Sequence, residues 1–523
     1  MNIPYKFILI QIIWIYSICY SQFSGGIGTI EDPYQISSAE DLNNIRNYLT
    51  SPYIQNSNLY FIQTSDINLG VLPWNEEKGW EPIGYFIDED NWERFESNYD
   101  GNNLKIYNLT INRPDTSCVG LFGWIWEANL SNIVLTGVNN ITGNEYVGSI
   151  IGFSAGSVIE NCTSIGSVSG QVEVGGMIGR ATGNSIVRFC YSDCIVRADE
   201  YDAGGLIGYF AISDIHNCSA SGEVYGGSYI GGFAGSCMGD AFHTNCRESN
   251  SNSRVFGVDQ VGGFVGKVYQ GVQLDQCYSN GVVNASGTSS GGFAGRIAST
   301  YVLNDTIKIN NCYSITEIIG NIDVGGFAGV SLDSEIKNCY ATGKTSSSIG
   351  SCGGFISNQV RSIINNCYWD IESTSQTVSD GGEGRNTSEM TLPYGANTYI
   401  GWDFNTVWRD DVADQNNGYP TFLWVSGIEE DYNILPETAA LYQNYPNPFN
   451  PTTEIKFSLY QPQNLNLSVF NSKGELVQTI FDGKKNEGMH SVKFDASRLN
   501  SGIYFYKLTS EDKTETKKML LLR

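Results

Sequence analysis

The chain has 523 residues, with 59 glycines but only 13 prolines, and charged residues make up 16% of it. Its formal net charge of −25 argues against nucleic acid and anionic membranes as partners. So few charges beside 31 tyrosines and 24 phenylalanines favour ordered β-structure over helices. The acidity is uneven, because residues 436–523 hold 11 basic and 9 acidic side chains, whereas the first 435 residues hold 19 and 46. This difference indicates two bodies with separate roles.

Residues 1–21 have the features of a secretory signal peptide. Lys6 precedes an uncharged, mainly apolar stretch that ends in small and polar residues, and a membrane-spanning helix would need about 20 apolar residues. We expect cleavage between Ser21 and Gln22. A lipoprotein site at Cys19 is the alternative.

A repeat with a period of about 28 residues occupies residues 118–368. Blocks such as Val-Gly-Gly-Met-Ile-Gly recur, with their first glycines 27 to 34 residues apart. These first glycines are Gly120, Gly148, Gly175, Gly204, Gly231, Gly262, Gly291, Gly325 and Gly353. Eight cysteines follow the same period, and six of them come directly after an asparagine. The cysteines are Cys162, Cys190, Cys218, Cys246, Cys277, Cys312, Cys339 and Cys367.

The residues around each cysteine indicate how one repeat folds. An aliphatic residue usually lies three positions earlier, as Ile159 does before Cys162. Residues three apart in a strand face opposite sides, so both can be buried only if the chain turns between them. An asparagine such as Asn161 tolerates the left-handed backbone of such a corner. Each repeat therefore reads as three short strands with corners, which is one coil of a parallel β-helix.

The cysteines are expected to form a buried ladder of free thiols. Equivalent positions in successive coils stack about 4.8 Å apart. A disulfide needs Cβ atoms about 3.8 Å apart. Buried free cysteine behaves as a small hydrophobic residue, so the ladder serves packing.

At the glycine blocks the chain resembles the GLUG-motif repeats of bacterial surface proteins. The resemblance implies an N-terminal cap and first coils over residues 22–117, repeats over 118–368 and a closing cap over 369–428. Within the first of these segments, Ser38-Ala-Glu-Asp-Leu predicts a capped amphipathic helix that covers the open end of the solenoid.

After a linker over residues 429–440, residues 441–523 resemble the type A C-terminal sorting domain of type IX (Por) secretion. Alternating apolar residues predict the strands of a small Ig-like β-sandwich there. The resemblance implies the type IX machinery as a partner, and export to the surface or exterior of a Gram-negative bacterium. The matching motif residues are Tyr445, Pro446, Asn447, Pro448, Phe449, Gly502, Tyr504, Lys517 and Lys518.

No residue pattern predicts a catalytic residue, a cofactor or a metal centre. The chain has three histidines, and it lacks both the His-Glu-x-x-His motif of metalloproteases and a Gly-x-Ser-x-Gly elbow in a strand-to-helix context. Acidic clusters at residues 88–90, 199–202 and 410–411 are interpreted as solvated turns. Structural calcium, or an acid–base pair for glycosidic cleavage, stays open at these clusters.

A tyrosine follows the ladder cysteine in four successive coils, and strand alternation directs it outward. We interpret this tyrosine stripe as a candidate glycan-binding platform, with mutual stacking that only stabilises the solenoid as the alternative. The stripe consists of Tyr278, Tyr313, Tyr340 and Tyr368, and Tyr191 holds the same position in an earlier coil.

The sequence therefore predicts an all-β protein, a parallel β-helix (β-solenoid) with end caps followed by a small β-sandwich. We expect an exported, monomeric, adhesin-like protein without catalytic activity that binds glycan or another extracellular partner. A carbohydrate-active β-helix enzyme and a purely structural surface protein are the alternatives, because a fold does not decide a function.

Overall fold

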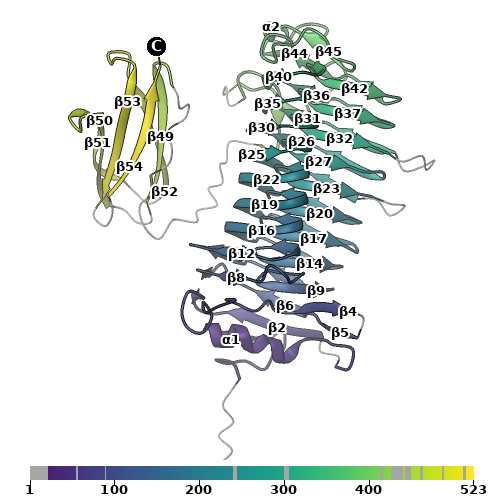
Figure 1. Ribbon diagram of the computed structural model, residues 1–523, viewed down its shortest axis with the longest axis vertical. Helices are drawn as coiled ribbons and strands as arrows, with labels where there is room; N and C mark the ends of the chain where they lie inside the picture. Colours follow the sequence, from purple (N-terminus) through teal and green to yellow (C-terminus); the bar gives the residue numbers. More distant parts are fainter. Residues whose placement is uncertain are drawn as a thin grey trace, which may run out of the picture. The chain divides into compact units, whose positions relative to one another are not determined.

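The computed structural model divides into two compact units, Met1–Trp424 and Val425–Arg523 (Figure 1). We describe each unit by itself. The described residues are 22–54, 57–88, 90–239, 244–299, 306–412, 416–425, 440–441, 444, 449–459, 463–485, 488–510 and 514–522. The predicted signal peptide over residues 1–21, the cleavage predicted after Ser21 and most of the linker predicted over 429–440 lie outside these residues.

Three parallel sheets form most of the first unit and run along the stack of coils in Figure 1. Within the described residues, one sheet has twelve strands, a second has nine and a third has 22 short ones. The twelve-stranded sheet consists of β1 (Tyr34–Ile36), β2 (Ser57–Gln63), β6 (Glu96–Asp100), β10 (Asn129–Ser131), β15 (Val158–Glu160), β18 (Ser185–Arg188), β21 (Ser213–His216), β24 (Thr244–Arg247), β28 (Val272–Asp275), β33 (Ile307–Asn310), β38 (Ser334–Lys337) and β43 (Ile363–Asn365).

The nine-stranded sheet consists of β9 (Phe122–Trp126), β14 (Ile151–Ala155), β17 (Ile178–Thr182), β20 (Ile207–Ala211), β23 (Ala234–Met238), β27 (Val265–Val268), β32 (Ala294–Ala298), β37 (Ala328–Leu332) and β42 (Ile356–Val360). The 22-stranded sheet consists of β3 (Ile67–Asn68), β7 (Lys105–Tyr107), β8 (Thr110–Asn112), β11 (Val134–Thr136), β12 (Asn140–Thr142), β13 (Glu145–Gly148), β16 (Thr163–Gly175), β19 (Tyr191–Gly204), β22 (Ser219–Gly231), β25 (Asn250–Gly257), β26 (Asp259–Gly262), β29 (Tyr278–Ser279), β30 (Val282–Ala285), β31 (Thr288–Gly291), β34 (Tyr313–Ser314), β35 (Glu317–Gly320), β36 (Ile322–Gly325), β39 (Tyr340–Ala341), β40 (Thr345–Ser347), β41 (Cys352–Gly353), β44 (Tyr368–Asp370) and β45 (Glu383–Arg385).

The glycine blocks lie where the chain passes from the 22-stranded sheet to the nine-stranded sheet. A Cβ atom on Gly231 would lie 1.9 Å from the Ala234 carbonyl oxygen, and one on Gly232 would lie 2.2 Å from the Gly263 carbonyl oxygen. Any side chain would therefore push neighbouring coils apart. One residue further, Phe233 begins a buried column of phenylalanines whose rings stack 4.6 Å apart at Phe233–Phe264 and 4.9 Å apart at Phe264–Phe293.

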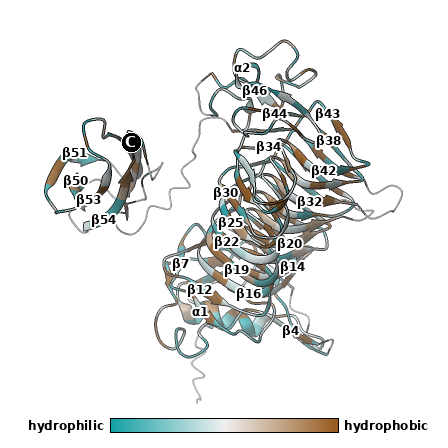
Figure 2. Cartoon of the chain, turned by 45° about the horizontal axis from the view of Figure 1, so that its top comes forward, coloured by the Kyte–Doolittle hydropathy of each residue, from teal (hydrophilic) through white to brown (hydrophobic). Residues whose placement is uncertain are grey.

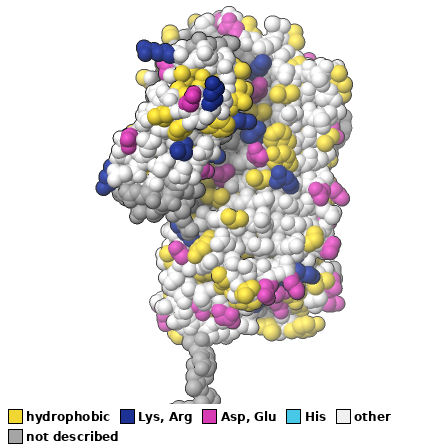
Figure 3. All heavy atoms as spheres, turned by 60° about the vertical axis from the view of Figure 1, so that its left-hand side comes forward, with side chains coloured by type: hydrophobic (Ala, Val, Ile, Leu, Met, Phe, Trp, Pro, Cys, Tyr) yellow, Lys and Arg dark blue, Asp and Glu magenta, His cyan; other side chains and the backbone are white. Residues whose placement is uncertain are grey.

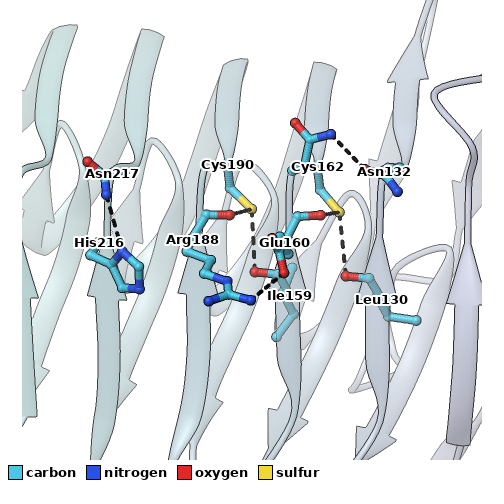
Figure 4. A network of polar contacts seen from close by, with 10 residues as sticks. Leu130, Asn132, Ile159, Glu160, Cys162, Arg188, Cys190, His216 and Asn217 are labelled. Carbon is cyan, nitrogen blue, oxygen red and sulfur yellow. Dashed lines mark hydrogen bonds and ion pairs between the residues drawn. The ribbon is translucent and has the colours of Figure 1, made fainter.

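The asparagines before the ladder cysteines form the corners that their backbone preference predicted. The φ angles of Asn161, Asn217 and Asn311 are 52°, 54° and 49°. The cysteines that follow are buried and free. As Figure 4 shows, the Cys162 and Cys190 thiols donate to the carbonyl oxygens two residues earlier, at 3.3 Å in both cases. Hydrophobic residues recur at equivalent positions along the stacked strands (Figure 2). Their buried side chains form one continuous core through the coils.

One assignment in the predicted ladder is wrong. Cys246 pairs in register with Ile215 and Leu274, so it lies in the aliphatic column rather than in the ladder. Ser249 takes the ladder position, since its hydroxyl accepts from the Cys218 amide at 3.2 Å. Cys246 follows Cys218 by the usual 28 residues, but this coil is 31 residues long, so the ladder position falls on Ser249, three residues after Cys246.

Short caps close the two ends of the solenoid. The helix α1 (Ala39–Asn44) begins at Ser38, whose side chain accepts from the Asp41 amide, and the 3-10 helix η1 (Ile45–Tyr48) follows. Leu42 and Ile45 are fully buried in the solenoid core. At the other end the chain forms α2 (Thr387–Met390), β46 (Trp408–Arg409) and β47 (Thr421–Phe422).

The second unit is a small antiparallel β-sandwich. One sheet contains β48 (Ala440–Leu441), β49 (Thr452–Leu459) and β52 (Gly488–Asp495). The other contains β51 (Leu476–Lys485), β50 (Gln463–Asn471), β53 (Gly502–Ser510) and β54 (Thr514–Leu521). Both sheets contribute to one buried core, for example through Phe457 and Val469. The predicted β-helix followed by a β-sandwich is thus confirmed.

Candidate functional site

The tyrosine stripe has the stacking that its sequence spacing predicts. Tyr278, Tyr313, Tyr340 and Tyr368 pair in register on β29, β34, β39 and β44. The rings of Tyr278 and Tyr313 lie 4.8 Å apart, and those of Tyr313 and Tyr340 lie 4.9 Å apart, each pair within 5° of parallel.

The stripe is not an open platform, because part of the closing cap covers it. We call this part, residues 399–412 and 416–424, the closing segment. Tyr340 is fully buried, donates its hydroxyl to the Pro420 carbonyl oxygen at 2.7 Å and accepts from Asn416 Nδ2 at 2.7 Å. The Trp408 ring lies 6.2 Å from Tyr313 and 6.0 Å from Tyr340. The expectation that these tyrosines present an exposed face to sugars is therefore wrong, and the stacking serves the closure of the solenoid.

The described sorting-motif residues lie in the β-sandwich, while Tyr445, Pro446, Asn447 and Pro448 lie outside the described residues. Phe449 is buried, and its amide donates to the Leu520 carbonyl oxygen at 2.9 Å. Gly502 opens β53, and the Tyr504 hydroxyl donates to the Asn500 carbonyl oxygen at 2.9 Å. Lys517 and Lys518 lie on β54. These residues belong to the sandwich itself.

A column of outward residues crosses the nine-stranded sheet. Trp124, Phe153, Arg180, Tyr209, Ser236, Lys267 and Arg296 pair in register from β9 to β32. We call these seven residues the outer column. Their neighbours in the strands, such as Ile125 and Val268, are buried, and within the column Tyr209 and Ser236 are buried as well. The column is aromatic at one end and cationic at the other.

An aromatic cluster surrounds the first residues of the outer column. The hairpin β4 (Tyr85–Asp88) and β5 (Asn91–Glu93) places Phe86 and Trp92 beside Trp124, at ring distances of 5.1 and 5.5 Å. Trp126 and Phe153 lie 6.5 and 6.2 Å from Trp124. We call these five residues the outer aromatic cluster. Phe86 is 42% exposed, so flat apolar rings are accessible from solvent.

Arg94 holds the outer aromatic cluster together. Its guanidinium lies 4.6 Å from the ring of Trp92 and 4.5 Å from the ring of Trp126, within the range of a cation–π contact. Glu96 forms an ion pair with the same guanidinium. A pocket of about 220 Å³ adjoins the hairpin and is lined by Tyr85, Phe86, Ile87, Glu81, Pro82, Arg113, Thr116 and Cys118.

An ionisable network occupies the middle of the outer column. Arg180 Nη1 donates to Glu173 Oε1 at 3.0 Å, and its guanidinium lies 4.7 Å from the Tyr209 ring. In the next coil the Ser236 hydroxyl donates to Asp202 Oδ1. Glu173 and Asp202 hold the corner before the nine-stranded sheet, with φ angles of 53° and 61°. Glu173 Oε2 is buried without a hydrogen-bond partner among the described residues.

Burial sets the protonation of the two carboxyl groups. It raises the pKa of Glu173 to about 8, helped by Asp202 and Glu145 and opposed by Arg180. It raises the pKa of Asp202 to about 7, opposed by the Ser236 hydrogen bond, Lys267 and Arg180. Both carboxyl groups therefore change charge near neutral pH.

The three predicted acidic clusters differ in how deeply their carboxyl groups are buried. Asp88 and Asp90 are exposed, in keeping with a solvated turn. Asp202 is 5% exposed, so the interpretation of residues 199–202 as a solvated turn is wrong for this residue. Asp411 is also buried and accepts from the Asn416 amide at 2.6 Å, which stabilises the closing segment. Among the residues described, no group of three or more metal-binding side chains converges.

Comparison with known proteins supports the two resemblances. Residues 443–522 match the family model of the secretion system C-terminal sorting domain. Residues 143–169, 199–225 and 320–347 match the GLUG motif. The chain carries both elements. The sorting domain implies export to the cell surface through the type IX (Por) machinery.

Two relatives share part of the solenoid sequence. Halomucin of Haloquadratum walsbyi is 38% identical over 166 residues, which is 31% of this chain and 2% of the relative. A putative Gly-rich membrane protein of Evansella cellulosilytica is 35% identical over 201 residues, 32% of this chain and 22% of the relative. The chain thus spans less than a quarter of either protein. No solved structure matches significantly. In the described part of this chain, no helix has the length and hydropathy needed to cross a bilayer.

Proposed function

We propose that this exported surface β-solenoid is a non-catalytic, adhesin-like protein that binds extracellular glycan through the outer aromatic cluster. It acts as a monomer in the envelope of a Gram-negative bacterium, and it is displayed or released after type IX secretion. The observation that carries the proposal is the group of partly exposed Trp and Phe rings on the nine-stranded sheet and the adjoining β4–β5 hairpin.

The geometry of the cluster suits stacking against sugar rings. Aromatic faces bind apolar surface at little cost in side-chain entropy. Trp92 and Trp126 are held in place by Arg94, so their side chains lose little conformational entropy when a ligand binds. The cluster projects from a sheet rather than from a loop, so the rings keep fixed spacings. On the face of the solenoid drawn in Figure 3, charged side chains are scattered among uncharged ones.

The test is binding of the purified protein to a glycan array and to soluble polysaccharides. Replacing Phe86 and Trp92 together with Ala should weaken binding about tenfold or more, because two stacking rings are lost. The matched control replaces Tyr225 and Phe256 with Ala, since their rings stack at 4.8 Å on the 22-stranded sheet. Equal losses in both variants, or no glycan binding by the wild-type protein, would refute the proposal.

Polysaccharide cleavage is a second candidate function, favoured by one observation. Glu173 and Asp202 lie on adjacent coils, and burial raises the pKa of both carboxyl groups; a protonated and an ionised carboxyl group together cleave glycosidic bonds. Their burial argues against access by a substrate. Release of reducing ends by the wild-type protein, abolished by Glu173→Gln, would establish this function in place of simple binding.

A further inference from the structure

We propose that the outer column binds an extended acidic polysaccharide, with Lys267 and Arg296 forming a subsite for uronate carboxylates. This inference rests on the proposed glycan-binding function and specifies the class of glycan. It follows from the placement of two neighbouring cations at the end of the column opposite the outer aromatic cluster.

Lys267 and Arg296 are paired in register on β27 and β32 and project from the same face. Neighbouring strands lie about 4.8 Å apart, so two like charges face solvent side by side. Neither side chain forms an ion pair within the described part of the chain, although the protein has a net charge of −25. Burial and the charge of Arg296 lower the pKa of Lys267, and the charge of Asp202 opposes this shift.

Tyrosines form the walls of this cationic subsite. Lys267 Nζ lies 4.6 Å from the centre of the Tyr229 ring and 4.1 Å from the centre of the Tyr269 ring. These contacts hold the ammonium group in place without neutralising it. A bound carboxylate would meet two cations and two flat rings, the combination that recognises a charged sugar.

The spacing along the outer column suits a polymer rather than a single sugar. Five strand steps separate β9, which carries Trp124, from β27, which carries Lys267. At about 4.8 Å per step this is roughly 24 Å. A chain of several sugar units could therefore contact the outer aromatic cluster at one end and the cationic subsite at the other. Binding at both ends would raise affinity through effective concentration.

The two carboxyl groups between the ends do not oppose an acidic ligand strongly. Glu173 is paired with Arg180, and Asp202 is hydrogen-bonded to Ser236. Their raised pKa values mean that much of their charge is lost near neutral pH. The outer column itself contains the basic residues Arg180, Lys267 and Arg296 and no acidic residue.

The experiment compares acidic polysaccharides with their own carboxyl-reduced forms. Polygalacturonate, alginate and hyaluronate are each titrated into the full-length secreted protein by calorimetry, beside the matched neutral polymer. We expect at least one acidic polymer to bind about tenfold more tightly than its reduced form, as a charge-assisted contact would give. Replacing Lys267 and Arg296 with Gln should remove this preference and leave binding of the neutral polymer unchanged.

The control replaces Lys308 and Lys337 with Gln, because both are exposed on adjacent strands of the twelve-stranded sheet. It removes the same charge from another face, so the preference for the acidic polymer should persist. Equal binding of acidic and reduced polymers by the wild-type protein, or a preference that survives Lys267→Gln with Arg296→Gln, would overturn this inference alone. Absence of binding to every polymer would overturn the proposed function together with it.

Discussion

At the scale of single residues, Ser249 shows which hydrogen bond a side chain in the thiol ladder makes. Its hydroxyl donates to the Arg247 carbonyl oxygen at 2.9 Å. The Cys277 thiol, one coil later, donates to the carbonyl oxygen of Asp275 at 3.4 Å. Both side chains therefore bond the carbonyl two residues earlier. The ladder position accepts a small side chain that satisfies this carbonyl, and cysteine adds apolar volume to it.

We accordingly expect Cys277→Ser to lower the free energy of unfolding by about 1 kcal/mol, through lost apolar burial rather than through an unsatisfied hydroxyl. The reverse change Ser249→Cys, which completes the ladder, should not destabilise the protein. Urea unfolding of the two variants measures both effects. If Cys277→Ser lowered the free energy of unfolding by far more than this, the serine hydroxyl would lack the hydrogen bond that Ser249 makes.

The described cysteines are all free, and burial raises the pKa of Cys162 and Cys190. The thiolate is the reactive form, so thiol reagents should label these residues only after unfolding. Mass measurement after treatment with a thiol reagent, with no reducing agent present, counts the labelled thiols and any disulfides in the folded and unfolded protein. Disulfides between coils in the folded protein would contradict the ladder of free thiols.

At the scale of elements, the closing segment and the tyrosine stripe act as one unit. The rings of Trp402 and Trp408 lie 4.4 Å apart, and Trp408 lies 4.6 Å from Phe422. These residues cover the outer face of the last coils, which would otherwise expose stacked aromatic rings to water. The stripe therefore contributes to stability and not to recognition.

Replacing Tyr340 with Phe should lower the free energy of unfolding by about 1–2 kcal/mol, because Asn416 and the Pro420 carbonyl oxygen both lose a buried partner. Thermal unfolding measures the loss. Tyr278→Phe is the matched control from the same stack, with a smaller expected effect. Glycan binding should be unchanged in both variants. A loss of binding in Tyr340→Phe alone would show that the tyrosine stripe is a binding site.

The ionisable network makes stability depend on pH. Burial raises the pKa of Glu173 and Asp202 above the values of unfolded carboxyl groups, about 4. The folded protein therefore holds protons that the unfolded chain releases, so this stabilisation is complete below about pH 4 and is lost as the pH rises through about 8. The groups that face the pair, Arg180, Lys267 and Glu145, modulate this effect.

We expect the network's contribution to the melting temperature to be several degrees greater at pH 5.5 than at pH 8.5. Glu173→Gln combined with Asp202→Asn should flatten the dependence relative to the wild-type protein. The control Glu223→Gln alters a surface ion pair with Arg254 at 3.0 Å and should leave the pH dependence unchanged. Parallel curves for the wild-type protein and the double variant would contradict the raised pKa values.

At the scale of the whole molecule, the two units carry separate functions. The solenoid and the β-sandwich have separate cores, and the basic side chains outnumber the acidic ones only after residue 435. The sorting domain accounts for export, while the outer column of the solenoid is the binding surface that we propose. This division predicts that either unit can be altered without unfolding the other.

Deleting residues 436–523 should leave a folded solenoid trapped in the periplasm. Cell fractionation locates the truncated protein, and its melting temperature should stay within a few degrees of that of the full-length protein. Deletion of the same length from the solenoid is the control, because it should unfold the passenger. Normal surface display of the truncated protein would show that the sorting domain is not needed for export.

Much of the fold was predictable from the sequence because its signals are local and repeated. A glycine block every 27 to 34 residues and an asparagine before most ladder cysteines describe a backbone that turns at fixed points, and coils that repeat must stack. Gly231 occupies its position because a Cβ atom would not fit there, and Asn161 tolerates the left-handed backbone of its corner. The sorting domain was predictable for a similar reason, since its motifs follow one another in order.

The candidate site was decided by the tertiary structure. Residues about 29 apart along the chain, such as Arg180 and Tyr209, become neighbours only when the register of the coils is known. Three extra residues moved Cys246 out of the ladder. The sequence marks this coil by the 31 residues from Gly231 to Gly262 and by His243 three positions before Cys246, but only the register of the coils shows that Ser249 takes the ladder position. Likewise, the sequence contained both the tyrosine stripe and the tryptophans of the closing segment. Which face those tryptophans would cover depended on contacts between residues about 100 positions apart, such as Tyr313 and Phe422, and such contacts leave no periodic trace in a single sequence.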